Sequence, residues 1–212
     1  MDEAVNAHPQ RHWKEILFSR RMLICIFIGF TSGLPLYVLI QLVPAWLRSN
    51  EVDLATIGLF SLVSLPYTWK FLWSPLMDRF RPPFLGRRRG WTLLTQLALL
   101  VSIGLLGQFD PTESLQVIVG LVFVVSLFSA SQDIVIDAYR RELLADDELG
   151  TGNSFFINAY RLSSLVPGSL ALILSDHLPW SVVYWVTAAF MLVGVLTTLV
   201  IREVSDDALA PH

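Results

Sequence analysis

The chain has 212 residues, of which 54% are hydrophobic and only 16% are charged, and its mean hydropathy is +0.57. Soluble domains carry about 25% charged residues, so this deficit indicates a protein that contacts lipid. The single cysteine excludes an internal disulfide. No metal-ligand cluster, phosphate-binding loop or nucleophile motif is visible, so we expect neither an enzyme nor a cofactor, and no nucleic-acid partner.

Six apolar runs are long enough to cross a hydrocarbon core of about 30 Å. In chain order they lie near residues 22–47, 54–77, 91–109, 115–139, 152–175 and 180–201. The first run is too long for the apolar part of a signal peptide and lacks a small-residue cleavage site. The sequence therefore predicts an all-α membrane domain over 22–201, with short tails at 1–21 and 202–212.

The distribution of basic residues predicts how these helices are oriented. Twelve Lys and Arg residues lie in the two tails and in the second and fourth loops, whereas the alternate loops hold only Arg48. Loops rich in Lys and Arg remain on the cytoplasmic side of a membrane. We therefore expect a multi-pass protein with both termini in the cytoplasm.

Three charged residues, Lys70, Asp133 and Arg161, fall inside the apolar runs, and Asp137 falls near a cytoplasmic boundary. Each charge costs about 2.5–3.5 kcal/mol on membrane-insertion scales, so these side chains are expected to face one another or a water-filled cavity. Asp133 is our candidate for a proton-coupling carboxylate. The alternative is a structural ion pair between Asp133 and Lys70 or Arg161.

Polar residues recur at helical spacing on several runs, which places them on one face of each helix. The first, fourth and fifth runs carry these stripes: Gly29, Gly33, Tyr37 and Gln41; Ser126, Ser129, Asp133 and Asp137; Ser154, Asn158, Arg161, Ser164 and Gly168. The third and sixth runs contain no charged residue. Helices 1, 2, 4 and 5 are therefore expected to be polar-faced, and helices 3 and 6 to be lipid-type.

The segment Lys70–Trp91 reads KFLWSPLMDRFRPPFLGRRRGW and joins the second and third runs. It resembles the signature loop between helices 2 and 3 of the major facilitator superfamily, which implies one half of that fold with a three-plus-three repeat. The resemblance implies a cytoplasmic gate in which Asp78 pairs with Arg87. The alternative is that the arginines only fix orientation, an explanation we favour for Arg79 and Arg89. The gate candidates are Asp78, Arg79, Gly86, Arg87, Arg88 and Asp137.

Four segments look like AmpG-type muropeptide permeases of the bacterial inner membrane. They read GFTSGLP (29–35), KFLWSPLMDRFRPPFLGRRRGW (70–91), SASQDIVIDAYRREL (129–143) and GTGNSFFINAYRLSSLVPGSLAL (150–172). The resemblance implies import of N-acetylglucosamine–anhydro-N-acetylmuramyl peptides for cell-wall recycling, driven by the proton gradient.

A muropeptide carries carboxylates and sugar rings, and the polar stripes offer groups for both. The substrate-binding candidates are Lys70, Arg161, Tyr37, Gln41 and Asn158. Arg suits carboxylates better than Lys, and an aromatic ring can stack on a sugar face. The alternatives are that Lys70 and Arg161 only neutralise Asp133 and Asp137, and that the aromatic rings pack between helices.

Members of the family are at least about twice as long as this chain and have a second six-helix half. We expect this half-length chain to need a second half, either as a homodimer or from a separate partner; a truncated copy is the third option. Two other functions remain open. One is a carrier of the same fold for another bulky anion such as acetyl-coenzyme A, and the other is a non-transporting partner protein.

Overall fold

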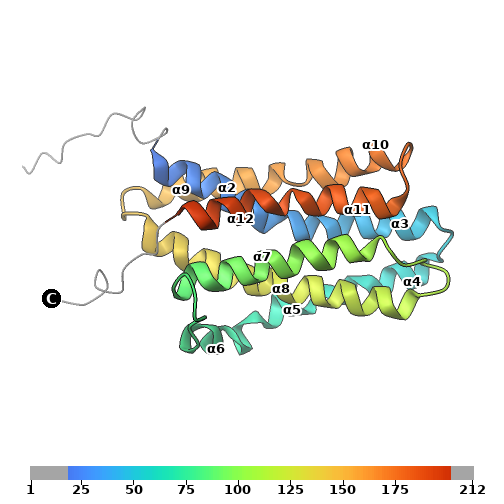
Figure 1. The fold of residues 1–212 in the computed structure, drawn as a ribbon, viewed down its shortest axis with the longest axis horizontal. Coiled ribbons are helices and arrows are strands. Elements are labelled where there is room, and N and C mark those ends of the chain that lie inside the picture. The colour runs from blue at the N-terminus through green and yellow to red at the C-terminus, as the bar shows by residue number, and fades with distance from the viewer. Residues whose placement is uncertain (1–18, 202–212) are drawn as a thin grey trace, which may run out of the picture.

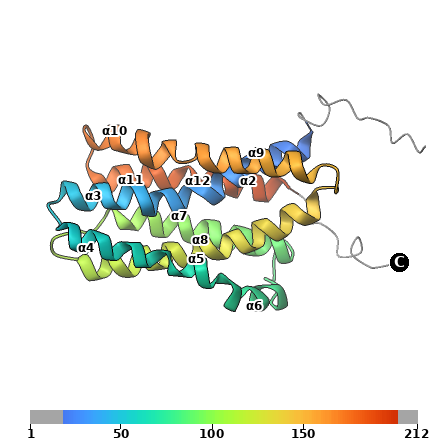
Figure 2. The same cartoon turned by 180° about the vertical axis from the view of Figure 1, so that it is seen from behind.

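The computed structural model describes residues 19–201, so most of both predicted tails lies outside the described residues. Within that range the chain is helical and contains no strand. Figures 1 and 2 show the helices running along one long axis, with α7, α11 and α12 on one face and α4, α5 and α9 on the opposite face. Five of the helical segments have the length and hydropathy to cross a membrane: Arg20–Ser49, Arg87–Leu106, Leu115–Leu143, Leu149–Ser175 and Trp180–Val200.

The first span consists of α2 (Arg20–Tyr37), a π-helical turn η1 (Val38–Leu42) and α3 (Val43–Ser49). Ser19 caps its start, because the Ser19 side chain accepts a hydrogen bond from the Met22 backbone N–H. The π turn lies directly before Pro44, whose nitrogen carries no hydrogen to bond the carbonyl of Ile40. The helix therefore widens at this point instead of ending.

The second apolar run is divided into short helical pieces, which explains why it is absent from the five candidate spans. It contains α4 (Leu54–Leu59), the 3₁₀ turn η2 (Phe60–Ser64), α5 (Leu65–Trp69), the 3₁₀ turn η3 (Lys70–Leu72) and α6 (Ser74–Arg79). Pro66 and Pro75 stand in the first turns of α5 and α6. Each proline removes a donor that a continuous helix would use, so the run restarts at both positions.

The remaining elements complete a bundle around the first span. They are α7 (Arg87–Leu106), α8 (Leu115–Leu143), α9 (Leu149–Leu162), the π turn η4 (Val166–Leu170), α10 (Ala171–Ser175), α11 (Trp180–Ala189) and α12 (Met191–Val200). Helix α2 packs against α8, α9 and α12, and α7 packs against α8, α11 and α12. The central position of α2 brings its polar face next to those of α8 and α9.

Glycines set the close approach between α2 and α9. A Cβ at Gly29 would lie 2.5 Å from the backbone oxygen of Phe156, and one at Gly33 would lie 2.6 Å from Oγ of Ser163. These distances are shorter than a carbon–oxygen contact allows, so only glycine fits at both positions. The small-xxx-small spacing thus serves helix packing.

Helices α7 and α12 meet through a buried hydrogen bond between two uncharged side chains. The hydroxyl of Thr198 donates a 2.9 Å hydrogen bond to Oε1 of Gln96, and both side chains are fully buried. A Cβ at Gly194 would lie 2.6 Å from Nε2 of Gln96, so the amide fits against a glycine. The third and sixth spans are therefore partly internal to the bundle, and their buried faces are not purely apolar.

Candidate functional site

The polar faces of α2 and α8 meet at Asp133. The hydroxyl of Ser32 on α2 donates a 2.5 Å hydrogen bond to the carboxylate of Asp133 on α8. Ser32 is buried, and Asp133 is half-buried. Among the described residues, neither Lys70 nor Arg161 forms an ion pair with Asp133, so the structure does not show the ion pair considered from the sequence. The direct partner of this carboxylate is a neutral hydroxyl.

Lys70 and Asp137 form a second contact beside Asp133. Nζ of Lys70 on η3 lies 4.0 Å from the carboxylate of Asp137, one helical turn from Asp133 on α8. Arg140 also bonds Asp137, at 3.0 Å. Both Lys70 and Asp137 remain well exposed in this structure, so water or a ligand can reach the pair. We call Ser32, Lys70, Asp133 and Asp137 the polar centre.

Two substrate candidates on the first span lie where that span packs against α9 and η4. The Tyr37 ring meets the Tyr160 ring edge-on, with ring centroids 5.9 Å apart. Oε1 of Gln41 is buried without a hydrogen-bond partner among the described residues, and its amide sits against Gly168. Tyr37 is half-buried, and its ring packs against the ring of Tyr160 on α9.

The remaining substrate candidates lie apart from the polar centre, on the exposed face of α9. Arg161 is exposed and forms no ion pair within residues 19–201. Asn158 is also exposed and donates a 2.8 Å hydrogen bond to the backbone oxygen of Ser154. Arg161 therefore does not neutralise Asp133 or Asp137 in this structure, and it leaves a cation available on the α9 face.

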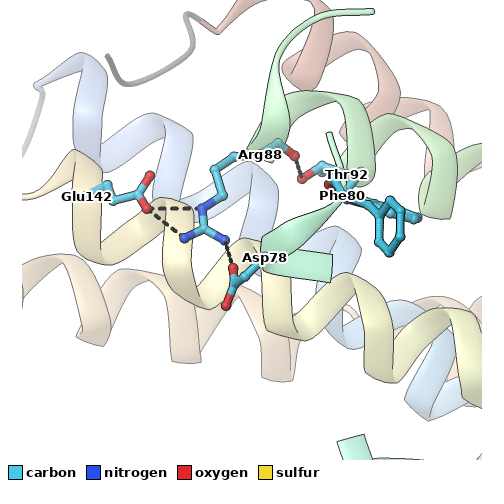
Figure 3. A network of polar contacts seen from close by, with 6 residues as sticks. Asp78, Phe80, Arg88, Thr92 and Glu142 are labelled. Carbon is cyan, nitrogen blue, oxygen red and sulfur yellow. Dashed lines mark hydrogen bonds and ion pairs between the residues drawn. The ribbon is translucent and has the colours of Figure 1, made fainter. Parts of the chain in front are cut away.

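The loop between α6 and α7 is held to α8 by one arginine, as Figure 3 shows. The guanidinium of Arg88 lies 2.7 Å from Asp78 and 2.8 Å from Glu142, and its Nε makes a further 3.0 Å bond to Glu142. Arg88 and Glu142 have only 13% and 11% of their side-chain surface exposed. The partner of Asp78 is thus Arg88 and not Arg87, which corrects the pairing expected from the sequence.

Local contacts fix the shape of this loop before Arg88. Gly86 has a φ of 83° directly before α7, a conformation that favours glycine. The indole N–H of Trp91 donates a 2.8 Å hydrogen bond to the Phe80 backbone oxygen, which ties the two ends of the loop together. A Cβ at Gly90 would lie 2.7 Å from the backbone oxygen of Phe84. The glycines therefore allow the tight return of the chain.

Two other basic residues of the loop differ in what they contact. Arg79 is the last residue of α6 and makes no ion pair within the described range. Arg89 donates hydrogen bonds to the backbone oxygens of Thr198 and Leu199, at 3.1 and 3.0 Å. A cation at a helix C-terminus offsets the partial negative charge of the last carbonyls. Arg89 therefore caps α12, in addition to any effect on orientation.

Sequence reasoning missed Ser32, Glu142 and the contact in which the Trp73 indole N–H donates to Ser131 at 3.1 Å. Ser32 and Glu142 both lie inside the segments that carried the family resemblance. Glu142 is an acid that directly follows Arg140 and Arg141 in the sequence, which was a usable signal. Nothing local distinguishes Ser32 from other helical serines. Among the described residues, no group of three His, Cys, Asp or Glu side chains is placed to hold a metal ion.

The chain was compared with known proteins, and residues 25–211 match the model of the Major Facilitator Superfamily. An anhydromuropeptide permease of Escherichia coli K12 is 45% identical over 90% of this chain and 39% of its own length. An uncharacterised protein of Haemophilus influenzae is 50% identical over 88% of this chain and 44% of its own length. The chain thus spans less than half the length of these relatives.

Proposed function

The chain belongs to the major facilitator superfamily, and from this premise we propose that it forms one six-helix half of a proton-coupled anhydromuropeptide importer in the bacterial inner membrane. The family and the apolar helices support a multi-pass membrane protein that acts in transport. The likeness to a relative named as an anhydromuropeptide permease supports the substrate class. The proton step is argued from the polar centre, and the second half is argued from the exposed apolar surface around it.

The observation that carries the proton step is the Ser32–Asp133 hydrogen bond inside the bundle. An ionised carboxylate within a membrane is costly unless it is paired, and a hydroxyl supplies one hydrogen bond but no charge. Ser32 can donate to an ionised carboxylate and accept from a protonated one, because a hydroxyl does both. Asp133 can therefore change its protonation state without losing its partner.

Lys70 and Asp137 are placed to link that proton to the substrate. The two side chains lie at the limit of ion-pair distance, 4.0 Å, and are exposed. A substrate carboxylate near Lys70 would compete with Asp137 for the ammonium group and change the electrostatic potential at Asp133 one turn away. Arg161 on α9 offers a second cation for the peptide part of a muropeptide, with Asn158 one turn away from it.

The second half is proposed from the surface of the second run and of α9. Large apolar side chains are exposed there: Leu62, Leu65, Trp69, Leu76, Ile157 and Leu162. Sites in this fold lie between two bundles whose relation is a rotation about the membrane normal. A bundle covering this surface would close the polar centre from the opposite side. It could come from a continuation of the chain, from a second copy or from a separate polypeptide.

Uptake of radiolabelled anhydromuropeptide into energised vesicles tests the proposal. The chain is assayed alone and together with the C-terminal half of the Escherichia coli relative, with and without a proton uncoupler. We expect uncoupler-sensitive uptake in at least one of these preparations, and its loss in Asp133→Asn. Asp146→Asn is the matched control, because Asp146 is an exposed acid outside the apolar runs whose ion pair among the described residues is with Arg141.

Two results would contradict parts of this proposal. Uptake by Asp133→Asn at the unmodified rate, still sensitive to the uncoupler, would remove Asp133 from the proton step. Uptake of labelled acetyl-coenzyme A in place of the muropeptide, in the same vesicles, would assign the alternative anion. An inserted chain that binds the second half but transports neither compound would favour a non-transporting partner.

A further inference from the structure

A groove runs between the beginning of α2 and the end of α12, away from the polar centre. These two segments lie side by side at one end of the bundle, as Figure 1 shows. The groove has a volume of about 300 Å³. Its walls are almost entirely apolar and are formed by Leu23, Phe27, Leu196, Thr197 and Val200, with Arg20 at its end.

The polar group at the end of this groove is a guanidinium with spare donors. Arg20 is exposed, and its one hydrogen bond within the described residues joins Nη2 to the backbone oxygen of Val200 at 3.2 Å. A guanidinium carries five N–H donors, so the Arg20 side chain can bond an anion without releasing α12. Thr197 is already satisfied, because its hydroxyl donates to the Val193 carbonyl at 2.6 Å.

The electrostatics of this end favour an anion. The N-terminus of α2 carries a partial positive charge of about half a unit, and Arg20 adds a full one. The C-terminus of α12 contributes about half a negative charge, and Arg89 caps it as well. Among the residues that the structure describes, no acidic side chain lines the groove. The neighbouring cation Arg21 is paired with Glu148, at 2.7 Å.

We propose that this α2–α12 groove binds an anionic glycerophospholipid, with an acyl chain along Leu23, Phe27 and Leu196 and the phosphate on Arg20. Arg20 is the first residue of a membrane-crossing helix, so its guanidinium stands at headgroup level. An apolar groove that ends in a cation with no ion pair among the described residues matches the shape and charge of such a lipid. A free anion would leave the apolar walls uncovered, and a zwitterionic lipid would gain less from Arg20.

The proposal is tested on the whole purified chain in a neutral detergent. Dioctanoyl phosphatidylglycerol, dioctanoyl phosphatidylcholine and inorganic phosphate are each titrated, and lipid retention is measured by native mass spectrometry alongside the midpoint of thermal unfolding. We expect the phosphatidylglycerol to bind at least about fivefold more tightly than phosphatidylcholine, as one basic side chain near a phosphate predicts. Phosphate alone should produce no shift of the midpoint.

Two variants and two controls locate the site. Arg20→Gln should abolish the preference for phosphatidylglycerol, and Leu196→Trp should block binding of both lipids by filling the groove. Arg141→Gln removes a cation of the same end that pairs with Asp146, and Leu192→Trp adds the same ring to an exposed position of α12 outside the groove. Both controls should bind lipid like the unmodified chain.

Each opposite result overturns the assignment. Equal retention of the two lipids by the unmodified chain would show that Arg20 does not select a charge. An equal loss in Arg141→Gln would indicate a general surface charge effect, and full competition by inorganic phosphate would indicate a free-anion site. If Arg20→Gln does not fold, unchanged lipid binding by Leu196→Trp would by itself contradict the groove.

Discussion

The hydroxyl of Ser32 on α2 bonds the carboxylate of Asp133 on α8 at 2.5 Å, and the two residues are separated by 101 positions in the sequence. This contact links α2 and α8, each of which carries one of the four segments that resemble the family. Its partner is neutral, so Asp133 is not held in an ion pair among the described residues. The first prediction concerns the loss of this hydroxyl.

Ser32→Ala should lower uncoupler-sensitive uptake by about tenfold, because a hydrogen bond to a charged group contributes about 1.5–3 kcal/mol. Ser32→Thr keeps the hydroxyl and should recover part of the rate. Ser175→Ala is the control, since within residues 19–201 its hydroxyl donates to the Leu172 carbonyl of its own helix and to no other group. Initial uptake rates in the two-half vesicles measure the effect. Equal rates for Ser32→Ala and Ser175→Ala would remove Ser32 from the proton step.

The two acids that share Arg88 should contribute unequally to stability. Glu142 is 11% exposed and makes two bonds to Arg88, whereas Asp78 is 51% exposed and makes one. Glu142→Gln should lower the free energy of unfolding by about 2 kcal/mol, because it weakens charge-assisted bonds in a largely buried site. Asp78→Asn should cost less than about 1 kcal/mol.

Reversible unfolding in mixed detergent, followed by circular dichroism, measures both differences. The double variant with Arg88→Ala tells whether each effect requires the arginine. Equal losses for Glu142→Gln and Asp78→Asn would mean that burial does not set the strength of these pairs.

Gly29 and Gly120 should respond in opposite ways to alanine. A Cβ at Gly29 would meet backbone atoms of Phe156, which cannot move aside, so Gly29→Ala should cost about 1–3 kcal/mol. Gly120 in α8 has open space, and Gly120→Ala should stabilise the helix by up to about 1 kcal/mol. Thermal unfolding midpoints of the two variants test this. A Gly29→Ala protein as stable as the unmodified one would mean that α2 and α9 can separate without cost.

The start of α4 should show a pH dependence that comes from Asp53. Its side chain accepts hydrogen bonds from the Thr56 hydroxyl and backbone N–H, which lower the pKa of Asp53 below its usual value of 3.8. A lowered pKa in the folded state means that this stabilisation is present above 3.8 and is lost as the pH falls below it.

Asp53→Ala should therefore unfold at a lower temperature than the unmodified chain at neutral pH, and the difference should shrink as the pH falls toward about 2. Asp53→Asn retains an acceptor oxygen for the cap but no titrating group, so its midpoint should change less with pH. A difference between Asp53→Ala and the unmodified chain that stays constant down to the acid limit would contradict this assignment.

Much of the architecture could be predicted from local sequence features. Five apolar runs form helical segments of membrane-crossing length, and the match to the superfamily confirms the fold expected from the Lys70–Trp91 segment. The two-proline pattern of the second run was visible as well, but its effect was not predicted. Pro66 and Pro75 break the run into short α and 3₁₀ pieces because each removes a donor.

The cytoplasmic position of both termini remains a prediction from the basic residues. The roles of Asp133, Lys70 and Arg161 also remain predictions, although the structure changes their partners. Lys70 lies beside Asp137, and Arg161 stands alone on α9 among the described residues. Sequence spacing placed Asp133 and Arg161 on polar helix faces but could not tell which faces come together.

The sequence by itself determined that this protein is a membrane-embedded helical bundle and which residues share a helix face, because apolar length and a 3.6-residue period are local properties. Only the tertiary structure decided that Asp133 meets Ser32 and that Asp78 meets Arg88 and not Arg87. Adjacent helical residues point about 100° apart, so the choice between neighbours depends on the rotation and depth of helices that are distant in sequence.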